Sequence, residues 1–238
     1  NWVILTSTRG YIFKLPTEKR ITDERFNVPH GQCIKDDEGN LWIYDRKGLI
    51  RYINVSTGKV KDFDIEIGDR VRDQWCHLVQ DSRGWVWIAT FGKGLYIYKP
   101  QTDEMTHFTY QVEGTNRICS NSLSNIMKDH SDGIWVTSES TGITHLSVLN
   151  DKISYFYPES KDVVNNATSF RLIHQMKNGD IMIGNRDGDI FRYDSQLKHK
   201  LENKHFNSSI YAVKEDENGK LWLGSRFNGL SIDNEWHV

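Results

Sequence analysis

The sequence has few of the features that mark membrane proteins, metalloenzymes or nucleic-acid binders. No apolar run approaches the roughly 20 residues of a membrane helix, and no two histidines have the spacing of a His-Glu-x-x-His or His-x-x-x-His motif. Charge of one sign is also lacking, since 30 basic and 32 acidic residues give a net charge of −2. We therefore expect no membrane segment, no nucleic-acid partner, no metal and no cofactor.

Cysteine is scarce as well. Cys33, Cys76 and Cys119 are an odd number at no metal-ligand spacing, and each lies before one of the Trp-containing apolar runs of the chain. This pattern favours small apolar side chains packed near the hub of the fold. One disulfide with one free thiol is the alternative that the sequence leaves open.

One short phrase recurs along the chain: an acidic turn with glycine, a Trp-led apolar run, then a second glycine. Full copies occupy residues 36–43, 81–88, 129–136 and 216–223, with a degenerate copy at 177–183 and a partial copy at 2–4. The first glycines are Gly39, Gly84, Gly133, Gly179 and Gly219, which gives steps of 45, 49, 46 and 40 residues. A period in the forties with strand content is typical of propeller blades.

Each copy predicts a hairpin followed by two more strands. The apolar runs, such as residues 41–44, are short, rich in aromatic and branched side chains, and bounded by turn residues, so they indicate buried strands. The Asp accepts hydrogen bonds from its own turn, and the following Gly supplies the positive φ that a tight hairpin needs. The second glycine leads into a third strand, and a weaker fourth follows at residues 61–63, 106–108 and 154–156.

The phrase resembles the two-component regulator propeller repeat, Asp-x-x-Gly-x-Leu-Trp-Ile-x-Thr-x-x-x-Gly-Leu. Thr90 and Gly94-Leu95 match it in the second full unit, and Gly229-Leu230 match it in the last, whereas Met182 replaces the Trp in the degenerate copy. The resemblance implies the periplasmic sensor half of a hybrid two-component kinase of Bacteroidetes. It also implies neighbouring propeller and signalling domains of the same polypeptide as partners, and a sensor rather than an enzyme.

The fold prediction is therefore all-β: a β-propeller of four-stranded antiparallel blades, five to six in number and an incomplete set from a larger propeller. Six closed blades would need roughly 270 residues, and the chain starts inside a strand, so we expect a piece of a longer protein. The predicted units are a partial first blade at 1–28 and blades at 29–72, 73–120, 121–168, 169–207 and 208–238, all in one region spanning 1–238.

The loops between second and third strands, together with the connections between blades, are predicted to form the ligand face. Cations and aromatic rings recur there, which suits an acidic oligosaccharide whose acid groups bind Arg or Lys and whose sugar faces stack on rings. The candidate ligand-binding residues are Arg9, Tyr44, Arg46, Trp75, Phe91, Lys93, Arg186, Arg226 and Phe227. Solvation alone also explains charged turns, so a purely structural interpretation stays open.

Other interpretations remain beside the sensor. A propeller lyase similar to streptogramin lyases would draw its acid and base from His30, Glu139 and His174. A protein-interaction scaffold and a homodimer are also open. Residues 129–133 and 185–189 superficially resemble calcium loops, but a turn is the better interpretation because the alternating oxygen ligands and the distal Glu are missing.

Overall fold

A computed structural model describes residues 2–5, 11–14, 19–21, 32–44, 49–65, 76–111, 118–139, 141–147, 152–156, 158, 169–233 and 235–237. Within these ranges every regular element is a strand. Five antiparallel sheets have four strands each, and β1–β3 form a sixth sheet of three strands. The prediction of a β-propeller with four-stranded blades is confirmed, with five complete blades.

The strands follow one another in space as they do in sequence. The three-stranded sheet holds β1 (Trp2–Leu5), β2 (Tyr11–Lys14) and β3 (Lys19–Ile21). The complete blades are blade 1 with β4 (Gln32–Lys35), β5 (Leu41–Tyr44), β6 (Leu49–Ile53) and β7 (Val60–Asp64); blade 2 with β8 (Cys76–Gln80), β9 (Val86–Thr90), β10 (Gly94–Lys99) and β11 (Glu104–Phe108); blade 3 with β12 (Leu123–Lys128), β13 (Ile134–Ser138), β14 (Ile143–Ser147) and β15 (Lys152–Phe156); blade 4 with β16 (Phe170–Gln175), β17 (Ile181–Asn185), β18 (Asp189–Tyr193) and β19 (Lys200–His205); and blade 5 with β20 (Ile210–Glu215), β21 (Leu221–Ser225), β22 (Leu230–Ile232) and β23 (Glu235–His237).

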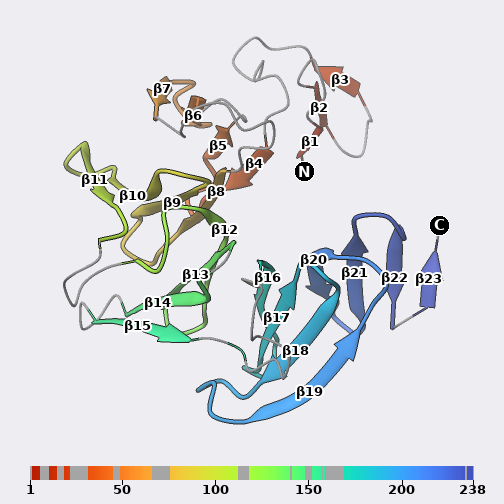
Figure 1. The fold of residues 1–238 in the computed structure, drawn as a ribbon. Helices are drawn as coiled ribbons and strands as arrows, with labels where there is room; N and C mark the ends of the chain where they lie inside the picture. Colours follow the sequence, from red (N-terminus) through yellow and green to blue (C-terminus); the bar gives the residue numbers. More distant parts are fainter. Residues whose placement is uncertain are drawn as a thin grey trace.

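The first strand of each blade lies toward the centre and the last toward the outside. Figure 1 shows β8, β12, β16 and β20 around the centre, with β11, β15, β19 and β23 at the rim. Contacts between neighbouring blades accordingly run from β8 to β12, from β12 to β16 and from β16 to β20. The inner strands therefore surround the centre of the propeller, which we call the channel.

A repeated polar clasp closes each Trp-containing hairpin. The turn aspartate accepts a hydrogen bond from the indole Nε1 of the tryptophan six residues later, at 3.3 Å for Asp36 and Trp42 and at 3.0 Å for Asp81 and Trp87. The other pairs are Asp129 with Trp135 at 2.6 Å and Asp216 with Trp222 at 2.9 Å. The same carboxylates also accept backbone N–H groups of their turns. The aspartate thus accepts the backbone N–H groups of the turn and at the same time orients the indole ring.

In blade 3 the turn departs from the prediction that its glycine supplies the positive φ. Asp132, one residue before Gly133, has the positive φ of 65° and donates its N–H to the Asp129 carbonyl. Aspartate tolerates this left-handed conformation better than most residues. Gly133 is needed for space, because a Cβ there would lie 2.5 Å from His145 Nε2 and 2.6 Å from Asp129 Oδ2.

Blade 4 lacks both members of the clasp. Met176 occupies the aspartate position and Met182 the tryptophan position. The carboxylate acceptor and the indole donor are therefore absent together. A different polar bond crosses the hairpin instead, since Arg192 donates from Nε to Oδ2 of Asp180 at 2.8 Å. Met182 pairs with Arg192 across β17 and β18, which places the guanidinium beside the position that the indole ring fills elsewhere.

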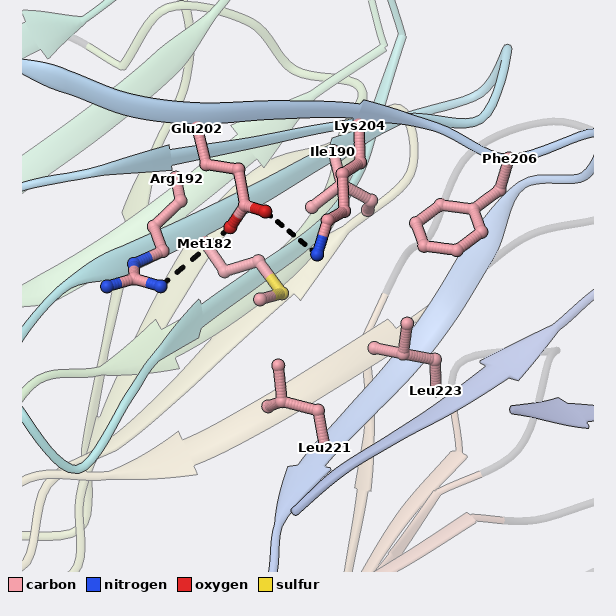
Figure 2. Close-up of a pocket in the computed structure, with 8 residues that line it drawn as sticks. All are labelled: Met182, Ile190, Arg192, Glu202, Lys204, Phe206, Leu221 and Leu223. Carbon is pink, nitrogen blue, oxygen red and sulfur yellow. Dashed lines mark ion pairs between the residues drawn. The ribbon is translucent and has the colours of Figure 1, made fainter. Parts of the chain in front are cut away.

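The smaller methionine leaves a cavity of about 30 Å³ between blades 4 and 5. Figure 2 shows Met182 in this space, with the ion-paired Arg192, Glu202 and Lys204 on one side and Leu221 and Leu223 on the other. The cavity has room for no more than a few water molecules. It is a packing defect of the degenerate copy and too small for an organic ligand.

The stability of the fold comes mainly from the layers between blades. Four clusters of buried side chains each join two neighbouring blades, from blades 1 and 2 to blades 4 and 5. Trp42, for example, lies 5.9 Å from Tyr98 of the next blade, ring centre to ring centre. Each fully buried large side chain contributes about 1.5–3 kcal/mol. Trp42, Trp87 and Trp135 belong to these clusters and so join neighbouring blades, while Trp222 of blade 5 remains 36% exposed.

Candidate functional site

The propeller has two faces, and the inner strands run from one to the other. We call the end with the Asp-Gly turns (residues 36–40, 81–85, 129–133, 176–180 and 216–220) the turn face. We call the opposite end the loop face; it carries the turns between second and third strands and the connections between blades. An inner strand of five or six residues spans roughly 15–20 Å, so a residue at its start and one at its end lie at different mouths of the channel.

Three of the predicted ligand-binding residues lie on the loop face of blades 4 and 5. Arg186 and Arg226 are exposed, and the ring of Phe227 is 76% exposed with the Arg226 guanidinium 5.0 Å from its centre. Ser209, between the two arginines, accepts the Arg226 N–H and donates from its hydroxyl to the Arg186 carbonyl. The structure therefore fixes the backbone beneath both cations and brings these neighbouring loops together.

Phe91 and Lys93 lie on the same face in blade 2, away from blades 4 and 5. Phe91 forms an isolated bridge with Ser122, and the Lys93 N–H donates to the Thr90 hydroxyl at 3.2 Å. Both side chains are half-buried. Arg9, Arg46 and Trp75 of the predicted set lie outside the described residues.

Tyr44 is the predicted ligand residue that the structure places elsewhere. Its side chain is 5% exposed and belongs to the core cluster between blades 1 and 2, beside Cys76. Burial raises the pKa of its hydroxyl well above the ordinary value. The sequence assigned Tyr44 to a loop because it ends the Trp-containing strand, but the next blade covers that strand to its last residue.

An ion pair that the sequence did not predict joins blades 3 and 4 at the loop-face mouth. Arg171 Nη2 lies 2.8 Å from Glu139 Oε1, and both side chains are largely buried. Arg171 also donates from Nε to the Ser169 hydroxyl, and its carbonyl accepts a bond from the Asn125 side chain. The sequence named Glu139 only for the lyase interpretation, and nothing local in the sequence indicates that Glu139 and Arg171 meet.

Two of the three residues named for the lyase interpretation lie at different faces of the propeller. Glu139 follows β13 at the loop face, whereas His174 lies near the end of β16 at the turn face. His174 lies three residues along β16 from Arg171, the partner of Glu139, so about 10 Å of strand separates the two positions. His30 lies outside the described residues. A general acid and base must both reach one substrate, so this pair cannot share a reacting centre.

The turn-face mouth of the channel holds a cavity of about 450 Å³. Its walls come from the inner strands of blades 1 to 4, and its apolar residues are Ile34, Leu78, Val79, Ile126, Met127 and Ile173. Lys35, Asp36, Asp37, Gln80, Lys128 and His174 supply the polar part. Ligand pockets for small molecules commonly have volumes of this order. This mouth was not part of the predicted site.

The residue just before each turn has a repeated role at this mouth. Gln80 accepts the N–H of Asp37 in the preceding blade at 3.0 Å, Gln175 accepts that of His130 at 2.6 Å, and Glu215 accepts that of Lys177 at 2.8 Å. Each of these acceptors ties its blade to the turn of the blade before it. Lys35 and Lys128 occupy the same position in blades 1 and 3. A lysine in two blades where the other three have Gln or Glu is the feature of the sequence that could have indicated this mouth.

Two histidines of the inner strands have pKa values below the ordinary range. Burial lowers the pKa of His77 to about 4, although its surface is not completely covered. Burial, followed by the charge of Lys214, also lowers the pKa of His174. Both imidazoles are therefore neutral at pH 7, and the cationic charge at the turn-face mouth is carried by its lysines.

We expect the stability of the protein to fall as the pH drops from 7 to 5 because of His77. Its pKa is about 4 in the folded state and about 6.5 in the unfolded state, so only the unfolded chain gains a proton in this window. The linked loss in free energy of unfolding is about 2 kcal/mol. Urea unfolding of His77→Gln at pH 7 and pH 5 measures it, and the variant should lack this part of the pH dependence.

Asp129 provides the internal reference for that experiment. Burial alone would raise the pKa of its carboxyl, but the nearby His145, the Trp135 indole and the N–H groups of Gly133 and Ser131 outweigh burial and hold it at about 2. Its stabilising contribution is complete above about pH 4 and is lost only as the pH falls toward 2. His174, whose pKa burial also lowers, contributes in the same window, so a pH dependence between 7 and 5 that is as large in His77→Gln as in the native chain would contradict the assignment to His77.

The remaining sequence predictions concern cysteines, metals and membrane helices. Cys33, Cys76 and Cys119 are all free thiols; Cys76 and Cys119 are buried, and burial raises the pKa of Cys33 to about 11. In the described part of the chain no three His, Cys, Asp or Glu side chains cluster as metal ligands. The same part contains no helix of the length and apolar character that would span a membrane.

The two suspected calcium loops are turns. Asp129 accepts the N–H groups of Ser131 and Gly133 within its own loop. In the second loop Asn185 accepts those of Asp187 and Asp189. The carboxylate and amide oxygens are therefore directed at backbone donors.

Comparison with known proteins agrees with this architecture. Residues 205–227 match the family model described as the two component regulator propeller. The chain is also similar to a protein named histidine kinase P4 from Formosa agariphila, at 24% identity over 205 residues, which are 82% of this chain and 15% of that protein.

Two solved structures share the fold. The extracellular domain of a putative hybrid two component system from B. thetaiotaomicron superposes with a TM-score of 0.71 at 19% identity, covering 99% of this chain and 31% of that one. Virginiamycin B lyase from Staphylococcus aureus superposes with a TM-score of 0.63 at 14% identity, covering 98% of this chain and 73% of that one. The chain spans less than a third of the length of the first solved domain and of the curated kinase.

Proposed function

We propose that this chain, in which residues 205–227 match the two component regulator propeller, is an extracytoplasmic sensing domain whose loop face binds an acidic oligosaccharide. The proposal includes a periplasmic location and further propeller and signalling domains in the same polypeptide. It is supported by the likeness to an extracellular domain of a hybrid two component system and to a histidine kinase. The domain would contribute recognition, and catalysis would belong to the kinase.

The observation that carries the ligand assignment is the pairing of Arg226 with Phe227. A phenyl ring that is 76% exposed presents an apolar surface to water beside a guanidinium. The N–H of Phe227 donates to the Ser208 hydroxyl and that of Asn228 to the Ser225 hydroxyl, so the loop is held in place before any ligand arrives. A sugar ring can stack on the phenyl group while its carboxylate binds the arginine.

Arg186 extends this surface into the neighbouring blade. Its loop is joined to the Arg226 loop through Ser209, and both guanidinium groups are exposed. Two cations on adjacent blades fit a ligand with acid groups on successive sugar units. A sugar unit whose acid group meets no cation would bind little better than a neutral sugar. Charge complementarity should therefore decide which oligosaccharides bind.

We expect charge reversal on the loop face to weaken binding without destabilising the fold. Arg186→Glu with Arg226→Glu should lower the affinity for a galacturonic acid trisaccharide by about tenfold or more, and Lys93→Glu, Arg9→Glu and Arg46→Glu extend the series. Isothermal titration calorimetry measures the affinity, and the melting temperature of the Arg186 and Arg226 double variant should stay unchanged because both side chains are exposed.

Lys198→Glu is the matched control, since Lys198 is exposed in blade 4 between β18 and β19. It should leave the affinity unchanged. Galactotriose, which lacks the carboxylates, should bind weakly to every variant. Equal binding of the trisaccharide to the native chain and to the double variant would refute the loop-face site. A protein-interaction scaffold or a homodimer would then be the better interpretation.

A further inference from the structure

The turn-face mouth of the channel has the features of a second binding site, independent of the proposed loop-face site. It is an open cavity of about 450 Å³ lined by residues from four inner strands, and the apolar half of its lining includes Ile34, Leu78, Ile126 and Ile173. Because these are the first strands of their sheets, each also has an edge that no further strand of its own blade covers. The cavity thus combines apolar walls with backbone polar groups.

The polar and charged side chains of the mouth differ in how many hydrogen bonds they already make within the protein. The carboxylate of Asp36 is buried and accepts bonds from the Asn40 backbone, the Asn40 side chain and the Trp42 indole. Gln80 is used on both ends, since it accepts from Asp37 and donates to the Gly84 carbonyl. These two residues hold the structure together and have little capacity left for a ligand.

Lys128 is held much more loosely. Its Nζ lies 4.0 Å from Asp37 and 3.9 Å from Asp132, beyond the 2.7–2.9 Å typical of a charge-assisted hydrogen bond. Asp132 already accepts the N–H and the hydroxyl of Ser82 at 2.9 and 2.7 Å. The Asp37 side chain is 80% exposed to water. The lysine charge is therefore only weakly neutralised by its neighbours.

Lys128 also differs from the residues at the equivalent position of other blades, which make a hydrogen bond between blades. Three blades place an acceptor before the turn to bind the N–H of the preceding blade, as Gln80, Gln175 and Glu215 do. In blade 3 that bond is replaced by the Ser82 to Asp132 pair, made from the turn itself. Lys128 therefore does not make this hydrogen bond between blades. Lys35 adds a second cation, which is exposed, to the same rim.

We propose that the turn-face mouth binds a small monocarboxylate with an apolar body, its carboxylate on Lys128 with Lys35 beside it and its body against Ile126 and Ile173. The apolar half of the lining favours a hydrocarbon or aromatic body over a sugar, whose hydroxyl groups would each need a polar partner. The neutral His174 at the rim adds a hydrogen-bonding group without adding charge. The site lies at the other end of the channel from Arg226, so the two can be tested separately.

The test uses benzoate as the probe and benzamide as its uncharged analogue. Methyl NMR spectra of the isoleucines should show saturable shifts for Ile126 and Ile173 with benzoate, and binding of benzamide should be weaker by about tenfold. Lys128→Gln, which restores the side chain found in blades 2 and 4, should weaken benzoate binding by about tenfold while the melting temperature stays the same or rises. Lys128→Arg should bind within about threefold of the native chain.

Control variants make each outcome decisive. Lys198→Gln changes an exposed lysine far from the mouth, and Arg226→Glu changes the loop face; both should bind benzoate as the native chain does. Equal binding of benzoate and benzamide would overturn the proposal, as would full binding by Lys128→Gln or shifts confined to residues outside the mouth. If Lys128→Gln proved unstable, loss of the charge preference in a folded Lys128→Met would serve as the same test.

Discussion

Replacing Asp81 with alanine is expected to lower the free energy of unfolding by about 4 kcal/mol. The carboxylate is buried, accepts the N–H groups of Arg83 and Trp85 at 3.0 Å each, and accepts the Trp87 indole at 3.0 Å. The Arg83 guanidinium binds it as well, at 2.6 Å. Alanine would leave two backbone donors and one indole donor without an acceptor where water has poor access. The midpoint of urea unfolding measures the loss.

Asp216→Ala is the matched control because the same clasp in blade 5 lies near water. Its partner Trp222 is 36% exposed, against 5% for Trp87. Water can replace the lost acceptor there, so we expect a clearly smaller loss than for Asp81→Ala. Asp81→Asn should fall between the native chain and Asp81→Ala, since one amide oxygen remains as an acceptor. Equal losses at Asp81 and Asp216 would show that the clasp acts only on its own turn.

Gly188→Ala is expected to be the next most damaging change, at about 3 kcal/mol or more. Gly188 has a positive φ of 99°, which disfavours any side chain. A Cβ there would also overlap with the Phe206 carbonyl oxygen and lie 3.1 Å from that of Ser208. These backbone atoms connect blade 4 to blade 5, and the Phe206 N–H donates to the Gly188 carbonyl at 2.8 Å. The substitution therefore forces the two blades apart.

Gly179→Ala separates backbone strain from crowding. Gly179 has a similar positive φ of 93°, but a Cβ there would meet only the Ser195 Cβ, at 3.7 Å. It should cost about 1 kcal/mol, the strain alone. Urea unfolding of both variants measures the difference, and a soluble Gly188→Ala that unfolds at the same urea concentration as Gly179→Ala would contradict the predicted contact with the blade connection.

The sequence predicted the blades well because their signals are local. The turn, the buried strand and the second glycine lie within about a dozen residues, and the strand pairing that they imply is the one observed. It did not predict the bond from Trp87 to Asp81, although both residues recur together and are lost together as Met176 and Met182. Treating the two positions as one pair would have identified the clasp.

The candidate sites were predicted less completely, because they depend on which residues of different blades meet. Arg186, Arg226 and Phe227 lie on the loop face as expected, since their place follows from the order of strands in one hairpin. Tyr44 does not, because burial by blade 2 is decided outside its own blade. The Glu139 to Arg171 pair likewise joins two blades across 32 residues of sequence.

The sequence by itself determined the repeat, the four strands of each blade and the faces on which their turns lie, because hydrogen bonds within one hairpin fix these features. Only the tertiary structure decided which repeated positions have a different role in different blades. Trp222 is partly exposed, whereas Trp42 is buried. Lys128 lines a cavity, whereas Gln80 at the equivalent position of blade 2 bonds to the turn of blade 1. The physical reason is that burial and charge pairing depend on the neighbouring blade, which the residues of a single repeat do not specify.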